Sequence, residues 1–191
     1  MKHPWPAFAR ARTLRASGRV AGCLALLCVW FVAGLAAPAS AQSVSCHSLE
    51  LQVAITPTEP AECFAGSSDD VDFKGEWEFI QMTAGDRFIL VGMQRAGLRS
   101  YFYRPTLKDA VESLLDEDDD VDWGDDIEHD VFKVRRFEID IRAGTLPCVG
   151  FVDASGQFAG AKSVVYGYIC NINGLAFADS EVADMLSRIG H

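Results

Sequence analysis

The sequence lacks the short motifs by which many hydrolases and nucleotide-binding proteins are identified. It contains no G-x-S-x-G nucleophile motif, no glycine-rich loop that would hold a phosphate after a strand, and no CxxC pair. Histidine is scarce, with four in 191 residues, and no two of those beyond the N-terminal stretch have the spacing of metal ligands. These absences argue against a phosphate-loop protein, a four-thiolate metal site and a hydrolase with a recognisable motif.

Acidic residues are absent from the first 41 positions, which instead show the three parts of an export signal. Five basic residues lead into an apolar run of fifteen residues at Cys23–Ala37, and small residues at Ala39 and Ala41 then suit signal peptidase. The run is shorter than the ~20 apolar residues of a spanning helix. We predict a cleavable signal peptide at 1–41 and no membrane span after cleavage; an uncleaved N-terminal anchor is the alternative.

Basic residues are also few in the predicted mature chain. Without the five in the signal, 12 basic residues stand against 27 acidic ones, which gives a net charge of −15. A charge this negative keeps a protein soluble and argues against nucleic acid or an anionic membrane surface as a partner. It favours cations and basic partners, while the signal predicts a periplasmic or secreted protein.

Four cysteines remain after the signal, an even number that is typical of disulfides in an exported chain. Three pairings can be drawn between them. We favour Cys46 with Cys63 and Cys148 with Cys170, because each bond closes a short local loop.

A hairpin at 148–170 supports the second bond. If its two cysteines face each other across an antiparallel pair, Gly150 lies opposite Tyr168 and Phe151 lies opposite Gly167. Aromatic side chains that shield cross-strand glycines stabilise a sheet. The register that brings Cys148 opposite Cys170 thus also forms two glycine–aromatic pairs, and this agreement supports both the hairpin and the disulfide.

The hydrophobic pattern predicts an α+β fold with a mainly antiparallel sheet of five to seven strands, two helices packed on one face, and two disulfides. Helices are expected from Thr106, as the N-cap, to about Leu115, and over 179–189. A change of phase at Arg135 and Arg136 suggests a β-bulge. The expected strands lie at 49–55, 76–82, 87–93, 100–104 and 131–141 and in the two arms of the hairpin.

The predicted organisation has three parts. A signal peptide at 1–41 precedes a disulfide-stapled segment at 42–72, and an α+β domain follows at 73–191. Within that domain, ten of the fifteen residues of the run 116–130 are Asp or Glu, and we expect this run to be a solvated loop.

The acidic run is the candidate metal site. Asp118, Asp120 and Asp122 have the alternate spacing that places carboxylates around a calcium ion, and Glu128 is the fourth candidate ligand. The run is not an EF-hand loop, because the required glycine and glutamate are each displaced by one position.

Two other kinds of candidate site are paired carboxylates on strands and combinations of serine with histidine. Glu76 with Glu78, and Glu138 with Asp140, are expected to face solvent. A hydrolase site could combine a serine with a histidine, but no nucleophile motif accompanies them; these residues are Ser45, Ser48, Ser100, His47, His129 and His191.

Three short stretches of the C-terminal half are distinctive: V-R-R-F at 134–137, C-V-G-F at 148–151 and V-V-Y-G-Y-I-C at 164–170. Over about 60 residues this half resembles a group of small exported proteobacterial proteins of unknown function. The resemblance implies the Cys148–Cys170 bond and the terminal helix, and it implies no catalytic residue.

Taken together, the sequence predicts an exported, non-enzymatic module that binds a protein or an envelope component, without a cofactor. Two alternatives remain: a calcium-binding protein that uses the run 116–130, and a small hydrolase.

Overall fold

The structure is a computed structural model that describes residues 42–69, 74–97, 105–116, 119–141, 144–153 and 162–190. The predicted signal peptide at 1–41 and the predicted strand at 100–104 lie outside these ranges. No helix within them is both long enough and apolar enough to cross a membrane.

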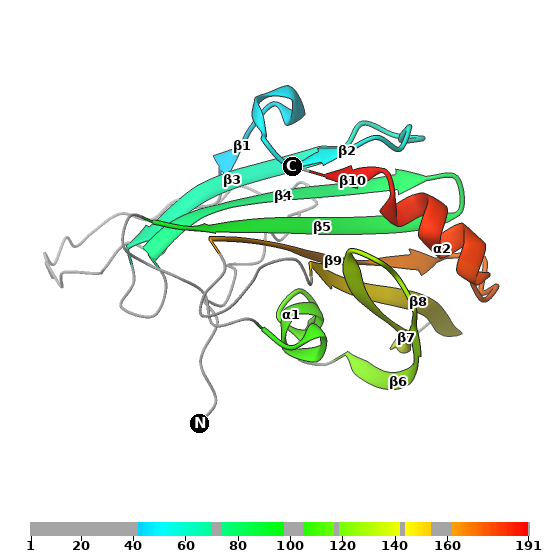
Figure 1. Cartoon of the computed structure of the whole chain (residues 1–191). Helices are drawn as coiled ribbons and strands as arrows, with labels where there is room; N and C mark the ends of the chain where they lie inside the picture. The colour runs from blue at the N-terminus through cyan, green and yellow to red at the C-terminus, as the bar shows by residue number, and fades with distance from the viewer. Residues whose placement is uncertain are drawn as a thin grey trace, which may run out of the picture.

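These residues form ten strands and two α-helices, and eight of the strands make one antiparallel sheet in the order β1-β3-β4-β5-β9-β8-β7-β6 (Figure 1). A second, two-stranded sheet pairs β10 with β2. In chain order the elements are β1 (Gln42–Ser43), the 3₁₀ turn η1 (Cys46–Ser48), β2 (Gln52–Val53), β3 (Glu62–Asp69), β4 (Lys74–Ala84), β5 (Arg87–Ala96), α1 (Leu107–Glu112), β6 (Asp120–Ile127), β7 (Phe132–Ile141), β8 (Gly144–Asp153), β9 (Ser163–Asn171), α2 (Asp179–Leu186) and β10 (Ile189–Gly190).

The expectation of five to seven strands is wrong, and the chain is mostly β. Four strands, β1, β3, β6 and β10, were not expected. Two of them have only two residues each and exist through pairing with distant segments, which local pattern does not reveal. The polar end of β3 and the acidic β6 are made of residue types that are depleted in strands. The acidic run therefore contains a strand where a loop was expected.

The central strands are apolar on both faces. On β8, Val149 and Phe151 point to one side, where they share a cluster with Val182, Met185 and Leu186 of α2. Cys148 and its neighbours at alternate positions point to the other side, which α1 covers. We call these sides the α2 face and the α1 face. The two helices lie on opposite faces, so the expectation that they share one face is wrong.

The change of phase in β7 has a different cause from the expected bulge at Arg135 and Arg136. Strand β7 pairs with β8 without interruption from Phe132 to Ile141. Phe132 is buried on the α2 face and Phe137 on the α1 face, because the cover changes sides along the strand. The irregularity in register lies instead in the neighbouring strand β6.

Both expected disulfides are present, Cys46–Cys63 and Cys148–Cys170. The hairpin register is confirmed as well, with Phe151 opposite Gly167 and Gly150 opposite Tyr168. The expected N-cap of α1 is also confirmed, since the Thr106 side chain accepts a hydrogen bond from the backbone N–H of Asp109.

The N-terminal segment is held on the sheet by Glu78, one of the carboxylates expected to face solvent. Its Oε2 accepts hydrogen bonds from the backbone N–H groups of Glu50 at 3.0 Å and Leu51 at 2.8 Å. Arg95 lies within ion-pair distance of both Glu78 and Glu50. Together with β2, which pairs with β10, these contacts anchor the stapled segment over β4 and β5.

Gly167 in β9 offers a test of the packing between the central strands. A Cβ atom at this position would lie 2.2 Å from the backbone carbonyl oxygen of Leu90 and 2.9 Å from the Phe151 ring. We expect Gly167→Ala to lower the free energy of unfolding by about 2 kcal/mol or more, measured by urea denaturation. Gly190→Ala is the control, because no atom lies within 4 Å of the added carbon. Equal stability of the two variants would contradict this packing.

Candidate binding surface at the acidic edge of the sheet

Strand β6 forms one edge of the large sheet, and its apolar residues explain why an acidic segment adopts a strand. Val121 and Trp123 alternate with acidic residues and turn towards the α1 face. The Trp123 ring lies 5.0 Å from that of Phe137, centroid to centroid, and its Nε1–H donates to Glu112 Oε1 at 3.3 Å. This anchor leaves the carboxylates of Asp120 and Asp122 on the opposite, α2 face.

A bulge divides β6 into two parts. Trp123 pairs with Phe137 and Asp126 pairs with Arg135, so that Gly124 and Asp125 both lie opposite a single residue of β7. Beyond the bulge, Arg135 Nε donates to Asp126 at 2.5 Å. This hydrogen bond lowers the pKa of the Asp126 carboxyl, because it favours the ionised form.

Before the bulge, carboxylates face carboxylates across the two strands. Asp120 lies opposite Asp140, and Asp122 lies opposite Glu138. Directly opposed side chains on one face of an antiparallel pair have Cβ atoms about 4.5–5.5 Å apart, so these like charges repel. We call these four residues the acidic ladder. All four are exposed, and within the described residues the one side-chain hydrogen bond of the ladder joins Thr145 to Asp140.

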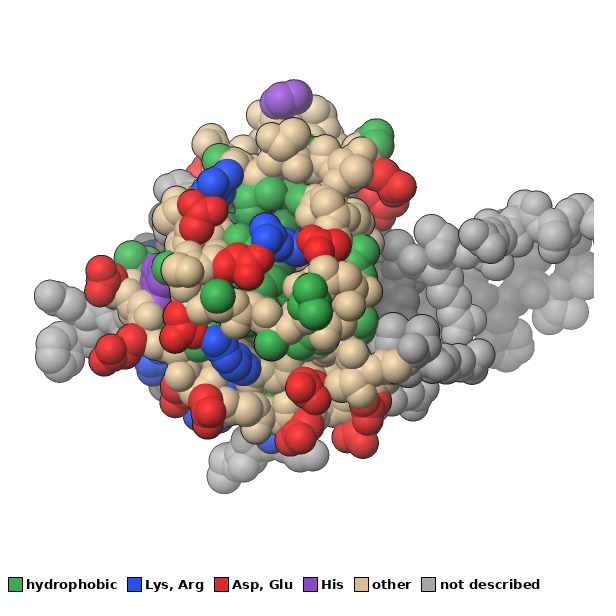
Figure 2. All heavy atoms as spheres, turned by 90° about the vertical axis from the view of Figure 1, so that its right-hand side faces the viewer, with side chains coloured by type: hydrophobic (Ala, Val, Ile, Leu, Met, Phe, Trp, Pro, Cys, Tyr) green, Lys and Arg blue, Asp and Glu red, His purple; other side chains and the backbone are tan. Residues whose placement is uncertain are grey.

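Basic residues near the acidic ladder are engaged elsewhere. Arg135 points away from it and pairs with Asp126. Arg136, which lies on the same face, reaches past the ladder to Asp179 at 2.5 Å and to the carbonyl oxygen of Phe177 at 3.1 Å. Figure 2 shows acidic side chains spread over the upper and lower parts of this end of the molecule, with a few basic side chains between them. Among the described residues, none of the ion pairs formed by basic side chains involves the ladder.

Two open cavities flank β6. One, of about 330 Å³, lies between the end of α1 and the start of β6. The other, of about 270 Å³, lies on the α2 face beneath Phe177 and includes Arg136. The first is lined by Glu112, Leu115, Asp116, Asp119, Asp120 and Val121.

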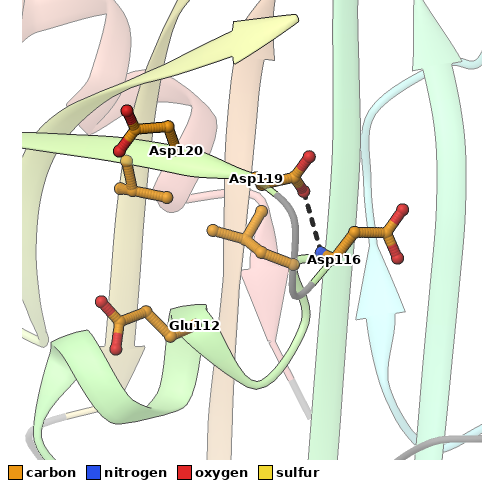
Figure 3. Close-up of a pocket in the computed structure, with 6 residues that line it drawn as sticks. Glu112, Asp116, Asp119 and Asp120 are labelled. Atoms are coloured by element: carbon orange, nitrogen blue, oxygen red, sulfur yellow. Dashed lines mark hydrogen bonds between the residues drawn. The ribbon is translucent and has the colours of Figure 1, made fainter.

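The carboxylates of the first cavity do not converge on one point (Figure 3). Glu112 and Asp116 extend in opposite directions, and the backbone N–H of Asp116 donates to Asp119 Oδ2 at 2.8 Å. Burial raises the pKa of the Tyr168 hydroxyl in the core below, and the charges of Asp119 and Asp116 raise it further. The lining of the cavity thus combines divergent carboxylates with the aliphatic side chains of Leu115 and Val121.

The described candidate calcium ligands lie at opposite ends of strand β6. Asp120 and Asp122 lie on the same exposed face of β6, whereas Glu128 follows the strand beyond the bulge. Asp118 lies outside the described residues. Within the part of the chain that the structure describes, no three His, Cys, Asp or Glu side chains are grouped as metal ligands.

The candidate hydrolase residues are engaged in local hydrogen bonds. The Ser48 hydroxyl donates to the carbonyl oxygen of Ser45 at 2.6 Å. His129 Nδ1 accepts from the backbone N–H groups of Val131 and Phe132, both at 3.3 Å. Ser100 and His191 lie outside the described residues. Among the other candidates, no serine–histidine hydrogen bond is formed.

Comparison with known proteins adds nothing to this geometry. No protein-family model, no curated protein and no solved structure matches the chain. The resemblance to small exported proteobacterial proteins therefore stays a prediction.

Sequence analysis missed Glu138 and Asp140 as parts of the candidate surface. Their role depends on which residues lie opposite them, and this requires β6 to be a strand. The available signal was the alternation of Val121 and Trp123 with aspartates, which is a strand pattern within an otherwise unfavourable composition.

Repulsion in the acidic ladder predicts that removing one charge stabilises the protein. We expect Asp122→Asn to raise the free energy of unfolding by about 0.2–1 kcal/mol at low ionic strength, because Glu138 then faces a neutral amide. The gain should shrink at about 1 M salt, where the Debye length is ~3 Å. Asp130→Asn, which changes the net charge equally outside the strand, is the control. An equal gain in both variants would assign the effect to net charge alone.

Proposed function

We propose that the protein is an exported, non-enzymatic binding module that holds a basic protein partner on the acidic ladder. The observation that carries this proposal is that two pairs of acidic residues, Asp120 with Asp140 and Asp122 with Glu138, lie directly opposite each other on an exposed sheet face. Opposed like charges destabilise a sheet, and a cationic partner would relieve that repulsion on binding.

The surroundings of the ladder support a protein partner over a small ligand. The cavities beside it are open, and each combines carboxylates with apolar walls. Such a surface suits lysine and arginine side chains, whose aliphatic stems pack on apolar atoms while their charged ends reach the acids. The net charge of −15 after signal removal would also accelerate encounter with a basic protein.

The disulfides support a location outside the cytoplasm. The structure contains two of them, Cys46–Cys63 and Cys148–Cys170. Disulfides form and persist in extracellular and periplasmic proteins. The choice between periplasm and secretion, and the cleavage of 1–41, belong to the proposal.

The experiment is capture of partners from envelope extract by immobilised protein that begins at Gln42. We expect the variant D120N/D122N/E138Q/D140N to lose the proteins that the unmodified protein retains at low salt, because their electrostatic contact is removed. The control E59Q/E62Q/E76Q/D130N removes four exposed charges away from the ladder and should retain them. Equal loss in both variants would reduce the effect to net charge, and retention in both would overturn the proposal.

Calcium provides a further check on the same samples. If the ladder acts through direct contact with the partner, capture should be unchanged by millimolar Ca²⁺ and by EDTA. Capture that requires Ca²⁺, with a matching change in Trp123 fluorescence, would replace the proposal by a metal-binding role for the run 116–130.

A further inference from the structure

The orientation of the backbone groups in β6 follows from hydrogen bonds elsewhere in the sheet. Between β5 and β9, the N–H of Ile172 donates to the carbonyl of Asp86 and the N–H of Ala96 donates to that of Lys162, both at 2.8 Å. Even-numbered residues of these two strands therefore point their backbone groups at each other. Because orientation alternates along a strand, odd-numbered residues of β9 point towards β8.

The pairing register of β9, β8, β7 and β6 then gives the direction of the backbone groups in each strand up to the edge of the sheet. Val149, opposite Ile169, points to β9, so its neighbour Cys148 points to β7. Phe137, opposite Cys148, points to β8, and the next residue, Glu138, points to β6. Asp122, opposite Glu138, consequently points to β7.

The backbone N–H and C=O groups of Val121 and Trp123 must then point outward, away from the sheet. Strand β6 is the last strand of the sheet, and no described residue hydrogen-bonds with these outward groups. The bulge at Gly124 and Asp125 ends the regular edge immediately afterwards. Among the described residues, the unpaired edge of β6 is therefore short and consists of the outward groups of Val121 and Trp123.

The side chains along this edge alternate in chemistry. Asp120 and Asp122 lie on the α2 face in the acidic ladder, and Val121 and Trp123 lie on the α1 face. An added strand would place every second side chain beside the ladder and the others beside the two apolar residues. A second copy of β6 would bring its own aspartates to the ladder, so its charge opposes self-pairing.

We propose that β6 accepts an extended segment of a basic partner as a further strand, held by main-chain hydrogen bonds to Val121 and Trp123. The segment alternates cationic and apolar residues, with its cations beside Asp120 and Asp122. This inference rests on the proposed function, and it adds the mode of binding and the pattern of the partner sequence.

The test uses a peptide, acetyl-Lys-Val-Lys-Val-Lys-Val-amide, and two N-methylated forms of it. In an antiparallel added strand, the valines, which lie on the same face as Val121, would direct their N–H groups at the edge, and the lysines would direct theirs at solvent. Methylation of the valine nitrogens should weaken binding by about tenfold or more, since it removes hydrogen bonds and adds bulk at the edge. Methylation of the lysine nitrogens should change the Kd by less than about threefold.

The outcomes separate the mode of binding from the proposed function. Equal binding of the two methylated peptides, abolished by D120N/D122N/E138Q/D140N, would overturn strand addition and leave the charge-based function standing. Failure of the unmethylated peptide to bind at low salt would overturn this inference, while the capture experiment tests the function separately.

A matched pair of protein variants tests the same edge from the other side. Val121→Pro removes the outward N–H and no bond to β7, so the fold should persist, as for prolines on edge strands. Val121→Thr keeps the N–H. We expect the proline variant to bind the peptide about tenfold more weakly and the threonine variant to bind like the unmodified protein. Equal affinities, with unchanged circular dichroism, would overturn the inference.

Discussion

The structure depends on covering the central strands β5, β9 and β8 on both of their faces. Each presents apolar side chains to either side, and neither helix is long enough to shield a full face. On the α2 face, α2 is joined by the N-terminal segment, which Glu78 and the β10–β2 pair hold in place. On the α1 face, α1 packs on the region around Phe137 and the Cys148–Cys170 bond. The cover of the α2 face stops along β7. The acidic ladder begins where that cover ends, which explains why charged side chains can occupy the last two strands.

Several elements were predictable because their signals are local. The hairpin at 148–170 combines two cysteines and two glycine–aromatic pairs, and one register satisfies all of them. Thr106 is followed by Asp109 and an apolar helical stripe, and α1 begins there. The buried run at Arg87–Met93 proved to be a central strand, as its apolar residues on both faces indicated. In each case, neighbours in the sequence carry enough chemistry to determine the conformation.

The remaining features depend on contacts between distant segments. Strand β3 includes Gly66, whose missing side chain leaves room for the Trp77 ring on β4, and a polar stretch alone does not reveal that contact. Strand β6 has aspartates at half of its eight positions, and its conformation follows from Val121 and Trp123 packing on β7. The two helices have similar amphipathic stripes but pack on opposite faces of the sheet. Helix α2 contacts the cluster that contains Val149 and Phe151, whereas α1 contacts the cluster around Phe137, and local sequence does not distinguish these two clusters. For the same reason, Glu138 and Asp140 became part of the candidate surface only when the register of β7 was known.

The pairing of β10 with β2 has a consequence for the order in which the chain can fold. Val53 lies opposite Ile189, and β5 pairs with β9 across an interval that contains α1, β6, β7 and β8. In the proposed export, which starts from the N-terminus, β2 and β5 would cross the membrane long before β10 and β9. Because contacts at large sequence separation form late and slowly, the sheet cannot close during most of the translocation. The early hairpins stay unpaired on one side until β9 arrives, and the stapled segment gains its last strand partner only when residues 189–190 have passed through.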